Sequence, residues 1–415
     1  MTQWAPVWRV KINSVDYTNV ILANLSITSG RTNIYTQAQA GYCQVNLINL
    51  NLAAIVIDIN DTISIDVKDT SGTFVPIFGG FVVDIGVTVS QVGSVQITQE
   101  VSITALGALS RLQKSITDGV LTQDFDGDQI ATILREVLFQ QWQQVPAALT
   151  WATYNPATTW AMAQNNGYGQ VDTPGNYELA QRSSDVTLVY DLVSALATSG
   201  LGYLYEDAQG LISYADSTHR TNYLAAYGYT DLTANQALGQ GITINTRAGD
   251  VRNDLTIKYG QNSTSSVSDS DQTSIGLYGD LAQIISTTIK HAADATAQAA
   301  FYLSLRAYPQ PIFESITFAL TNPELDNADR DALINVFMGQ PIALNDLPSN
   351  MSSGVFQGFV ESWTFRASYN ELSVKLLMSP LAYSLQAMRW NDVPVTEAWN
   401  TVSPTLDWAN ATIVS

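Results

Sequence analysis

Apolar and polar residues alternate along most of the first 118 residues, a pattern typical of strands with one buried face. The clearest run places its larger apolar side chains at every second position: Phe81, Val83, Ile85, Val87 and Val89. A turn at 91–94 leads into a second alternating run over 95–105, which predicts an antiparallel hairpin. Repeated hairpins of this kind favour a small β-barrel or sandwich.

Helical spacing begins at Asp126 and marks a change of architecture. The apolar stripe over 130–138 predicts a helix with Asp128 as its N-cap. A second helix is predicted between Asp185, as its cap, and Gly200, and a hairpin over 203–214 follows it. These elements form a compact helix-plus-hairpin module.

The chain after this module shows both the alternation typical of strands and the apolar spacing typical of helices. We expect a strand over 254–259, a flexible Ser-rich loop over 261–273 and an Ala-rich helix over 291–307. The acidic residues Asp326, Asp329 and Asp331 precede an apolar run over 333–337, where they would favour a helix N-terminus.

The two ends of the chain resemble each other. The run Phe-Gly-Gly-Phe-Val at 78–82 matches Phe-Gln-Gly-Phe-Val at 356–360. Four further matches follow the same order: 44–47 with 315–318, 61–65 with 340–344, 101–106 with 372–377, and 109–112 with 381–385. Collinear matches indicate an internal duplication. We therefore predict a β-rich α+β fold with two related small β-barrels flanking a mixed α/β middle of two small domains.

This organisation gives five predicted segments. The first barrel covers 1–118 and the second 313–390, with an α/β domain at 119–240, a small α/β domain at 241–312 and a C-terminal arm at 391–415. Trp390 stands directly before the arm, and Trp399 and Trp408 lie along it, in a segment with neither helical nor strand periodicity. These tryptophans are predicted to bind a partner, on which the arm becomes ordered.

Charge and composition narrow the function. The 415 residues include 37 acidic and 18 basic side chains and have a net charge of -19. This charge disfavours binding to the phosphates of nucleic acid. Only 13% of residues are charged, which suits a chain packed into an assembly. No segment resembles a signal peptide or a bilayer-spanning run, so we expect synthesis in the cytoplasm and no membrane anchor.

Candidate chemistry is sparse, and the sequence predicts no enzyme, cofactor or metal. Cys43 stands in an alternating stretch as a buried thiol, while His219 and His291 lie far along the chain, so a Cys/His peptidase is disfavoured. The acidic run 124–128 lacks the later ligands of a calcium loop and reads as helix capping. The aromatic stretch 151–177 could stack on sugars, but core or interface packing is the favoured interpretation.

Taken in order, these runs resemble the tail hub or minor tail proteins of long-tailed bacteriophages, especially phages of actinobacteria. The resemblance covers nearly the whole chain and rests on 78–82, 127–130, 202–207, 252–254, 274–279, 339–342 and 359–363. It implies a homotrimeric hub at the virion's tail tip or baseplate that adapts a sixfold tail tube to a threefold tip. It also implies tube-like barrels, contacts with the distal tail protein ring, the tape measure protein and tip or receptor-binding proteins, and passage of DNA without specific binding.

Two alternatives remain open at this point. A tail-tip carbohydrate-binding adhesin or depolymerase would use the aromatic stretch or a pair of carboxylates facing one cleft. A hub from a related injection machine or gene-transfer particle would assemble by the same interactions and differ only in its setting. For the hub itself, we expect part of the acidic excess to line the central channel.

Overall fold

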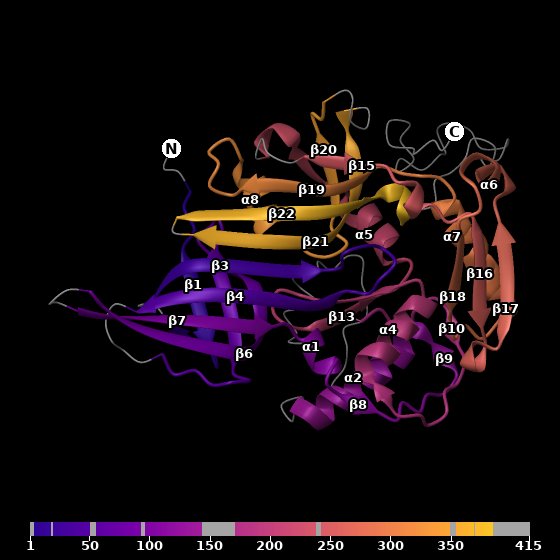
Figure 1. Cartoon of the computed structure of the whole chain (residues 1–415), viewed down its shortest axis with the longest axis horizontal. Helices are drawn as coiled ribbons and strands as arrows, with labels where there is room; N and C mark the ends of the chain where they lie inside the picture. Colours follow the sequence, from indigo (N-terminus) through magenta and orange to yellow (C-terminus); the bar gives the residue numbers. More distant parts are fainter. Residues whose placement is uncertain are drawn as a thin grey trace.

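The computed structural model describes residues 4–17, 20–49, 55–92, 96–142, 171–237, 242–348, 354–368 and 370–384. Strands dominate, and the largest sheet joins 13 strands from both ends of the chain (Figure 1). The predicted β-rich α+β class is confirmed. No helix within these ranges is long and apolar enough to cross a bilayer.

The N-terminal part of the sheet is a unit of six strands in the order β1-β5-β6-β7-β4-β3, with β2 outside β1. Their bounds are β1 Trp8–Ile12, β2 Val15–Tyr17, β3 Val20–Gly30, β4 Gln39–Asn49, β5 Thr62–Lys68, β6 Phe74–Val92 and β7 Gln96–Leu106. The predicted hairpin is β6 and β7, which pair antiparallel along almost their whole length.

The C-terminal part repeats this order as β14-β20-β21-β22-β19-β15. The bounds are β14 Thr230–Thr233, β15 Thr243–Asn245, β19 Ile312–Ala319, β20 Pro341–Asn345, β21 Phe356–Ser368 and β22 Glu371–Pro380. Each strand has a counterpart in the first unit, in the order given. One difference is that β14 runs parallel to β20, whereas β1 runs antiparallel to β5.

The two units also share their register. Phe78 lies opposite Ile65 just as Phe356 lies opposite Leu344. Both long strands carry a bulge at the same place, Val83 in β6 and Glu361 in β21. The duplication read from the sequence is therefore present in the strand pairing.

One of the sequence matches needs a correction. Counting from Phe81 and Phe359, the pairing of β7 and β22 makes Val101 equivalent to Val374, two residues beyond the predicted match at Leu372. A shift of two keeps the same side chains on the same face of a strand. Alternation alone could not detect it.

The two units are joined edge to edge by β3 and β21, which pair antiparallel from Gly30 opposite Ser362 to Asn24 opposite Ser368. Figure 1 shows β21 and β22, in yellow, lying directly beside β3 and β4, in indigo. Buried apolar side chains run through both units and into the adjoining helices as one core, including Ile27, Val45, Phe313, Phe365 and Leu134.

The middle of the chain packs against one end of this sheet (Figure 1). Its first part contains α1 Leu109–Leu112, β8 Ile116–Thr117, β9 Asp124–Phe125, α2 Asp126–Trp142, β10 Glu178–Leu179, β11 Thr187–Leu188, α4 Val189–Ser199, β12 Tyr203–Glu206, β13 Ile212–Ala215 and α5 His219–Tyr227. Its second part contains β16 Asp254–Tyr259, β17 Ser265–Ser270, α6 Gln272–Tyr278, β18 Ala282–Ser286 and α7 Ala292–Arg306.

Short helices complete the chain: 3-10 turns η1 Ala234–Gln236, η2 Ala248–Asp250, η3 Gln261–Ser263 and η5 Leu381–Tyr383, and helix α8 Asn327–Ile334. The predicted hairpin over 203–214 is β12 and β13. The predicted Ala-rich helix is α7, flanked by His291 and Ala307. The five predicted segment boundaries stay predictions.

Two predicted helix N-caps were wrong. Helix α2 begins at Asp126 rather than after Asp128, because the Asp126 carboxylate turns inward and accepts hydrogen bonds from Asn176, Tyr177 and Tyr214. Leu188, not Asp185, stands at the N-cap of α4.

The Ser-rich segment is not a loop throughout. Residues 265–270 form β17, because the neighbouring edge of β16 supplies backbone partners along six residues. Helix α8 also begins earlier than predicted, at Asn327, with the side chain of Asp326 accepting from the Asp329 amide.

Candidate assembly interface

The seam between the two units is held by a buried carboxylate, Glu361, at the bulge of β21. Its Oε1 accepts from Arg220 Nη1 at 2.8 Å and from Ser379 Oγ at 2.5 Å. Its Oε2 accepts from Arg31 Nε at 2.6 Å and from Arg220 Nη2 at 3.0 Å. One carboxylate thus joins a strand end of the first unit, a helix of the middle and a hairpin of the second unit.

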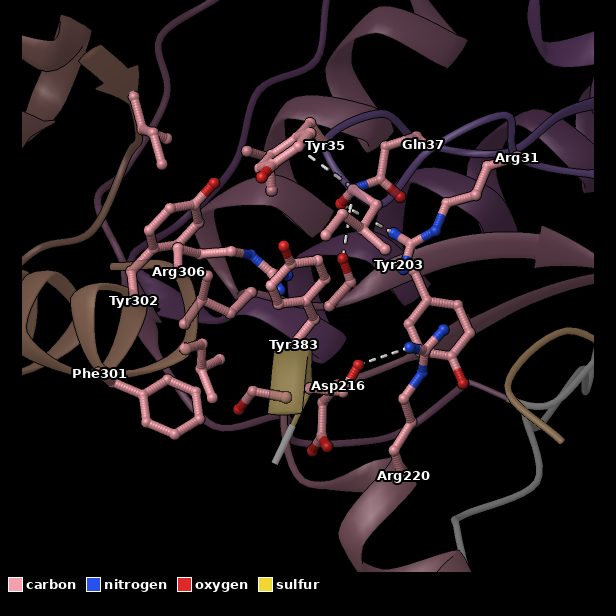
Figure 2. Close-up of a pocket in the computed structure, with 18 of the residues that line it drawn as sticks. Arg31, Tyr35, Gln37, Tyr203, Asp216, Arg220, Phe301, Tyr302, Arg306 and Tyr383 are labelled. Carbon is pink, nitrogen blue, oxygen red and sulfur yellow. Dashed lines mark hydrogen bonds between the residues drawn. The ribbon is translucent and has the colours of Figure 1, made fainter. Parts of the chain in front are cut away.

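Electrostatics explain why this carboxylate stays ionised. Burial alone would raise the pKa of Glu361, but the Arg220 and Arg31 guanidiniums outweigh burial and lower the pKa to about 2. Arg220 also lies over the Tyr203 ring, 4.7 Å from its centroid, and Figure 2 shows this stack. A buried pair of this kind is costly to break because the remaining charge has no water around it.

Backbone geometry completes the seam at Gly30. This residue has φ +98°, and a Cβ there would meet the Glu361 carbonyl and Ser362. The next amide, of Arg31, donates to the Glu361 carbonyl at 2.9 Å. Glycine is therefore required for β3 to reach the bulge of β21.

Among the described residues, no strand lies beside the equivalent place in the first unit. In the second unit, one edge of β21 carries β20 at its start and β3 over 362–368. The same edge of β6 carries β5 over 74–81, but among the described residues nothing pairs with it beyond Asp84. We call this stretch, 84–92, the open edge of β6.

Side-chain burial differs in the same way. Val87 and Val89 of the open edge are 55% and 63% exposed, while their equivalents Phe365 and Ala367 are 1% and 4% exposed. An unpaired strand with exposed apolar residues at alternate positions is a template for pairing with another chain. The open edge of β6 therefore has the properties of an assembly surface.

A second unpaired edge belongs to β15. This strand is the counterpart of β3, and within the described residues it pairs only with β19. The register of β3 on β21, transferred to the other pair, puts Ile244 opposite Val87 and Arg247 opposite Asp84. Asp84 is exposed, and Arg247 forms a half-exposed ion pair with Glu314. In this register one oppositely charged pair, Asp84 and Arg247, would face each other across the two open edges.

Groups that could carry chemistry are engaged in the fold. Cys43 is fully buried in β4, and burial raises the pKa of its thiol, so the thiolate is disfavoured. His219 Nδ1 lies 2.5 Å from Asp172 Oδ2 in a buried pair. No cluster of three or more His, Cys, Asp or Glu side chains that could hold a metal occurs in the described ranges.

The predicted partner-binding residues Trp390, Trp399 and Trp408 lie outside the described residues, as does most of the aromatic stretch, 151–170. The sequence reasoning did not single out Glu361, Arg31 or Arg220. A signal was present for Glu361, since a lone carboxylate interrupts the apolar run Phe359-Val360-Glu361-Ser362-Trp363. Buried charges in such runs need partners, which the sequence does not identify.

No family model matches the sequence, and no curated protein matches it. Two solved structures are similar along nearly the whole chain. One is the 43 kDa tail protein of prophage MuSo2 from Shewanella oneidensis, with TM-score 0.53 and 11% identity over 91% of this chain and 99% of that chain. The other is the tail protein from Neisseria meningitidis MC58, with TM-score 0.57 and 10% identity over 92% and 98%. This chain therefore has the fold of these two tail proteins.

Proposed function

We propose that the chain is the hub subunit of a phage-type tail tip, and that three copies close a ring of six related β units. The open edge of β6 carries this proposal, because it is an unpaired apolar strand at the place where the other unit is already paired. The fold shared with two tail proteins supports it. The role is structural, and the proposal includes no catalytic step. An origin in a phage of actinobacteria stays a prediction.

The strand pairing between the two units of one chain is the template for the proposed pairing between two copies. Within a chain, β3 of the first unit pairs with β21 of the second. By the same register, β15 of one copy pairs with the open edge of β6 in the next, with Ile244 opposite Val87 and Arg247 opposite Asp84. Such a head-to-tail interface closes into a ring when the rotation per copy divides a full turn.

Three copies then give six similar units with only threefold true symmetry. The β units form a pseudo-sixfold surface for a sixfold tail tube and its distal ring, while the inserted middle keeps threefold spacing for tip proteins. The tape measure protein and the receptor-binding tail proteins are the further partners of this arrangement. Its place is the tail tip or baseplate of the virion.

The ring encloses the path by which DNA leaves. Part of the net charge of -19 is expected on the channel wall, where repulsion of phosphates prevents binding of the passing DNA. A density map of the trimer with a neutral or basic lumen would contradict this part of the proposal.

The C-terminal tryptophans are proposed to dock on a neighbouring tail protein. Deletion of the residues after Asn391 should leave the trimer intact and abolish attachment of that neighbour. Infectious tails assembled from the truncated chain would contradict the docking role.

The mass of the purified chain in solution, measured by light scattering, tests the ring. The wild-type chain should have the mass of three copies. Val87→Asp should shift the mass toward one copy, because it places an unpaired carboxylate in the new seam. Val186→Asp is the matched control, since Val186 is 70% exposed and lies on neither open edge. A wild-type monomer, or equal effects of the two variants, would contradict the proposal.

A further inference from the structure

A cavity of about 140 Å³ lies between the seam and the middle of the chain. Its walls come from the segment after β3, from β12, α5 and α7, and from η5 (Figure 2). Polar and aromatic side chains dominate the lining, among them Arg31, Tyr203, Arg220, Tyr302, Arg306 and Tyr383. This volume accommodates a small oxyanion together with solvent.

Arg306, the last residue of α7, lines this cavity with its guanidinium N–H donors. Arg306 is 7% exposed, and within the described ranges its Nε and Nη1 have no hydrogen-bond partner. No carboxylate of the described residues forms an ion pair with it. Leaving a charged donor buried and unpaired is expensive.

Aromatic rings hold the Arg306 guanidinium in place. Its centre lies 4.4 Å from the centroid of the Tyr383 ring, 5.6 Å from that of Tyr35 and 5.7 Å from that of Tyr302. Figure 2 shows the side chain extending from α7 toward Tyr383. The ring faces and a hydrogen bond with the Tyr302 hydroxyl stabilise the charge, but neither is an anionic acceptor.

The charge around the cavity is positive, although the chain as a whole is strongly acidic. The described lining of the cavity holds three arginines, Arg31, Arg220 and Arg306, and one carboxylate, Asp216. Glu361 already binds Arg31 and Arg220. Among the described residues, Arg306 is thus the arginine of the lining that has no carboxylate partner.

We propose that this cavity binds an oxyanion, either a free phosphate or sulfate or the carboxylate of a neighbouring polypeptide, through the Nε and Nη1 of Arg306. The site goes beyond the proposed ring, because its walls come from one chain and do not include the open edges. Its recognition chemistry is a charge-assisted hydrogen bond in a partly enclosed, aromatic-lined space.

Calorimetric titration at constant ionic strength tests the site with two probes, inorganic phosphate and a short N-acetylated peptide rich in aspartate. At least one should bind the wild-type chain, and Arg306→Gln should weaken that binding by roughly tenfold to a hundredfold. Phosphate binding that depends on Arg306 supports a small-anion site. Peptide binding alone with that dependence supports a carboxylate supplied by a partner.

Arg252→Gln is the matched control. Arg252 lies 4.8 Å from the centroid of the same Tyr35 ring, but its Nη1 donates to the carbonyls of Gly249 and Val251. This variant should bind like the wild type. If Arg306→Gln does not fold, Arg306→Lys replaces it, since it keeps the charge and removes the Nε and Nη1 donors. No binding by the wild type, or equal binding by the Arg306 variant, overturns the proposal.

Discussion

The Arg31 guanidinium at the end of β3 binds Glu361 in β21, with Nε 2.6 Å from Oε2, across 330 positions of sequence. This contact ties the two related units together at a place where the second unit carries a buried charge and the first does not, since Val83 occupies the equivalent bulge. The ion pair therefore belongs to the join rather than to the repeated fold.

Replacement of Glu361 by Gln should destabilise the chain strongly. The change leaves two buried guanidiniums without a counter-charge, and breaking such pairs costs about 3–5 kcal/mol. Denaturant unfolding measures the loss. Glu371→Gln, an exposed change in the same hairpin, should cost little, and equal losses would contradict the structural role of Glu361.

Gly30→Ala should cost more than Gly72→Ala. Both glycines have positive φ, +98° and +87°, so both variants suffer backbone strain of about 1–2 kcal/mol. Only at Gly30 does the new Cβ also meet the neighbouring strand, whereas at Gly72 it meets open space. The difference in unfolding free energy between the two variants measures the close approach of β3 to the bulge, and no difference would show that the approach is looser than described.

A charge exchange tests the transferred register. Asp84→Arg should weaken trimer formation, because it would lie opposite Arg247 of the next copy, and Arg247→Asp alone should weaken it as well. The double variant, Asp84→Arg with Arg247→Asp, should recover a substantial part of the trimer at low salt. Analytical ultracentrifugation gives the trimer fraction. If the double variant forms no more trimer than the weaker of the two single variants, these two side chains do not lie opposite each other.

Stability should fall as pH rises toward neutrality, in part because of Glu206. Burial raises the pKa of Glu206 to about 7, although the amides of Leu109 and Gly41 donate to its carboxylate and oppose that shift. The folded pKa exceeds the unfolded value, so this stabilisation is complete below about pH 4.3 and is lost as pH rises through about 7.

Glu206→Gln should therefore flatten the dependence of unfolding free energy on pH between about 5 and 7. The variant should be less stable overall at pH 5, because one amide then faces an NH2 group. Some slope should remain, since burial also raises the pKa of Asp126 and Asp207 to about 7. An unchanged slope would assign the pH dependence to other groups.

Local patterns predicted much of the fold. The alternation of β6 and β7, the helix α7 and the matched runs at 78–82 and 356–360 identified the duplication before any pairing was known. These signals are local or repeated, so a single sequence carries them.

The sequence pattern did not predict which distant strands pair. Nothing in the sequence around Ile27 and Phe365 indicates that these two residues lie opposite each other. Apolar alternation shows that one face of a strand is buried, but it does not identify the adjacent strand. The short strands β14 and β15 were missed as members of the second unit for the same reason. The site residues Arg31, Arg220 and Arg306 come from three separate elements and share no motif.

Cross-linking of Val87→Cys and Ile244→Cys in one chain tests the ring most directly. Cys43 is fully buried and does not compete for the reagent. A short thiol-specific cross-linker should convert the purified protein into covalent trimers, because each copy joins the next through one such pair. The same chain with Val186→Cys in place of Val87→Cys should stay uncross-linked at matched concentration. Single chains from both variants would contradict the pairing of β15 with the open edge of β6, and with it the proposed hub.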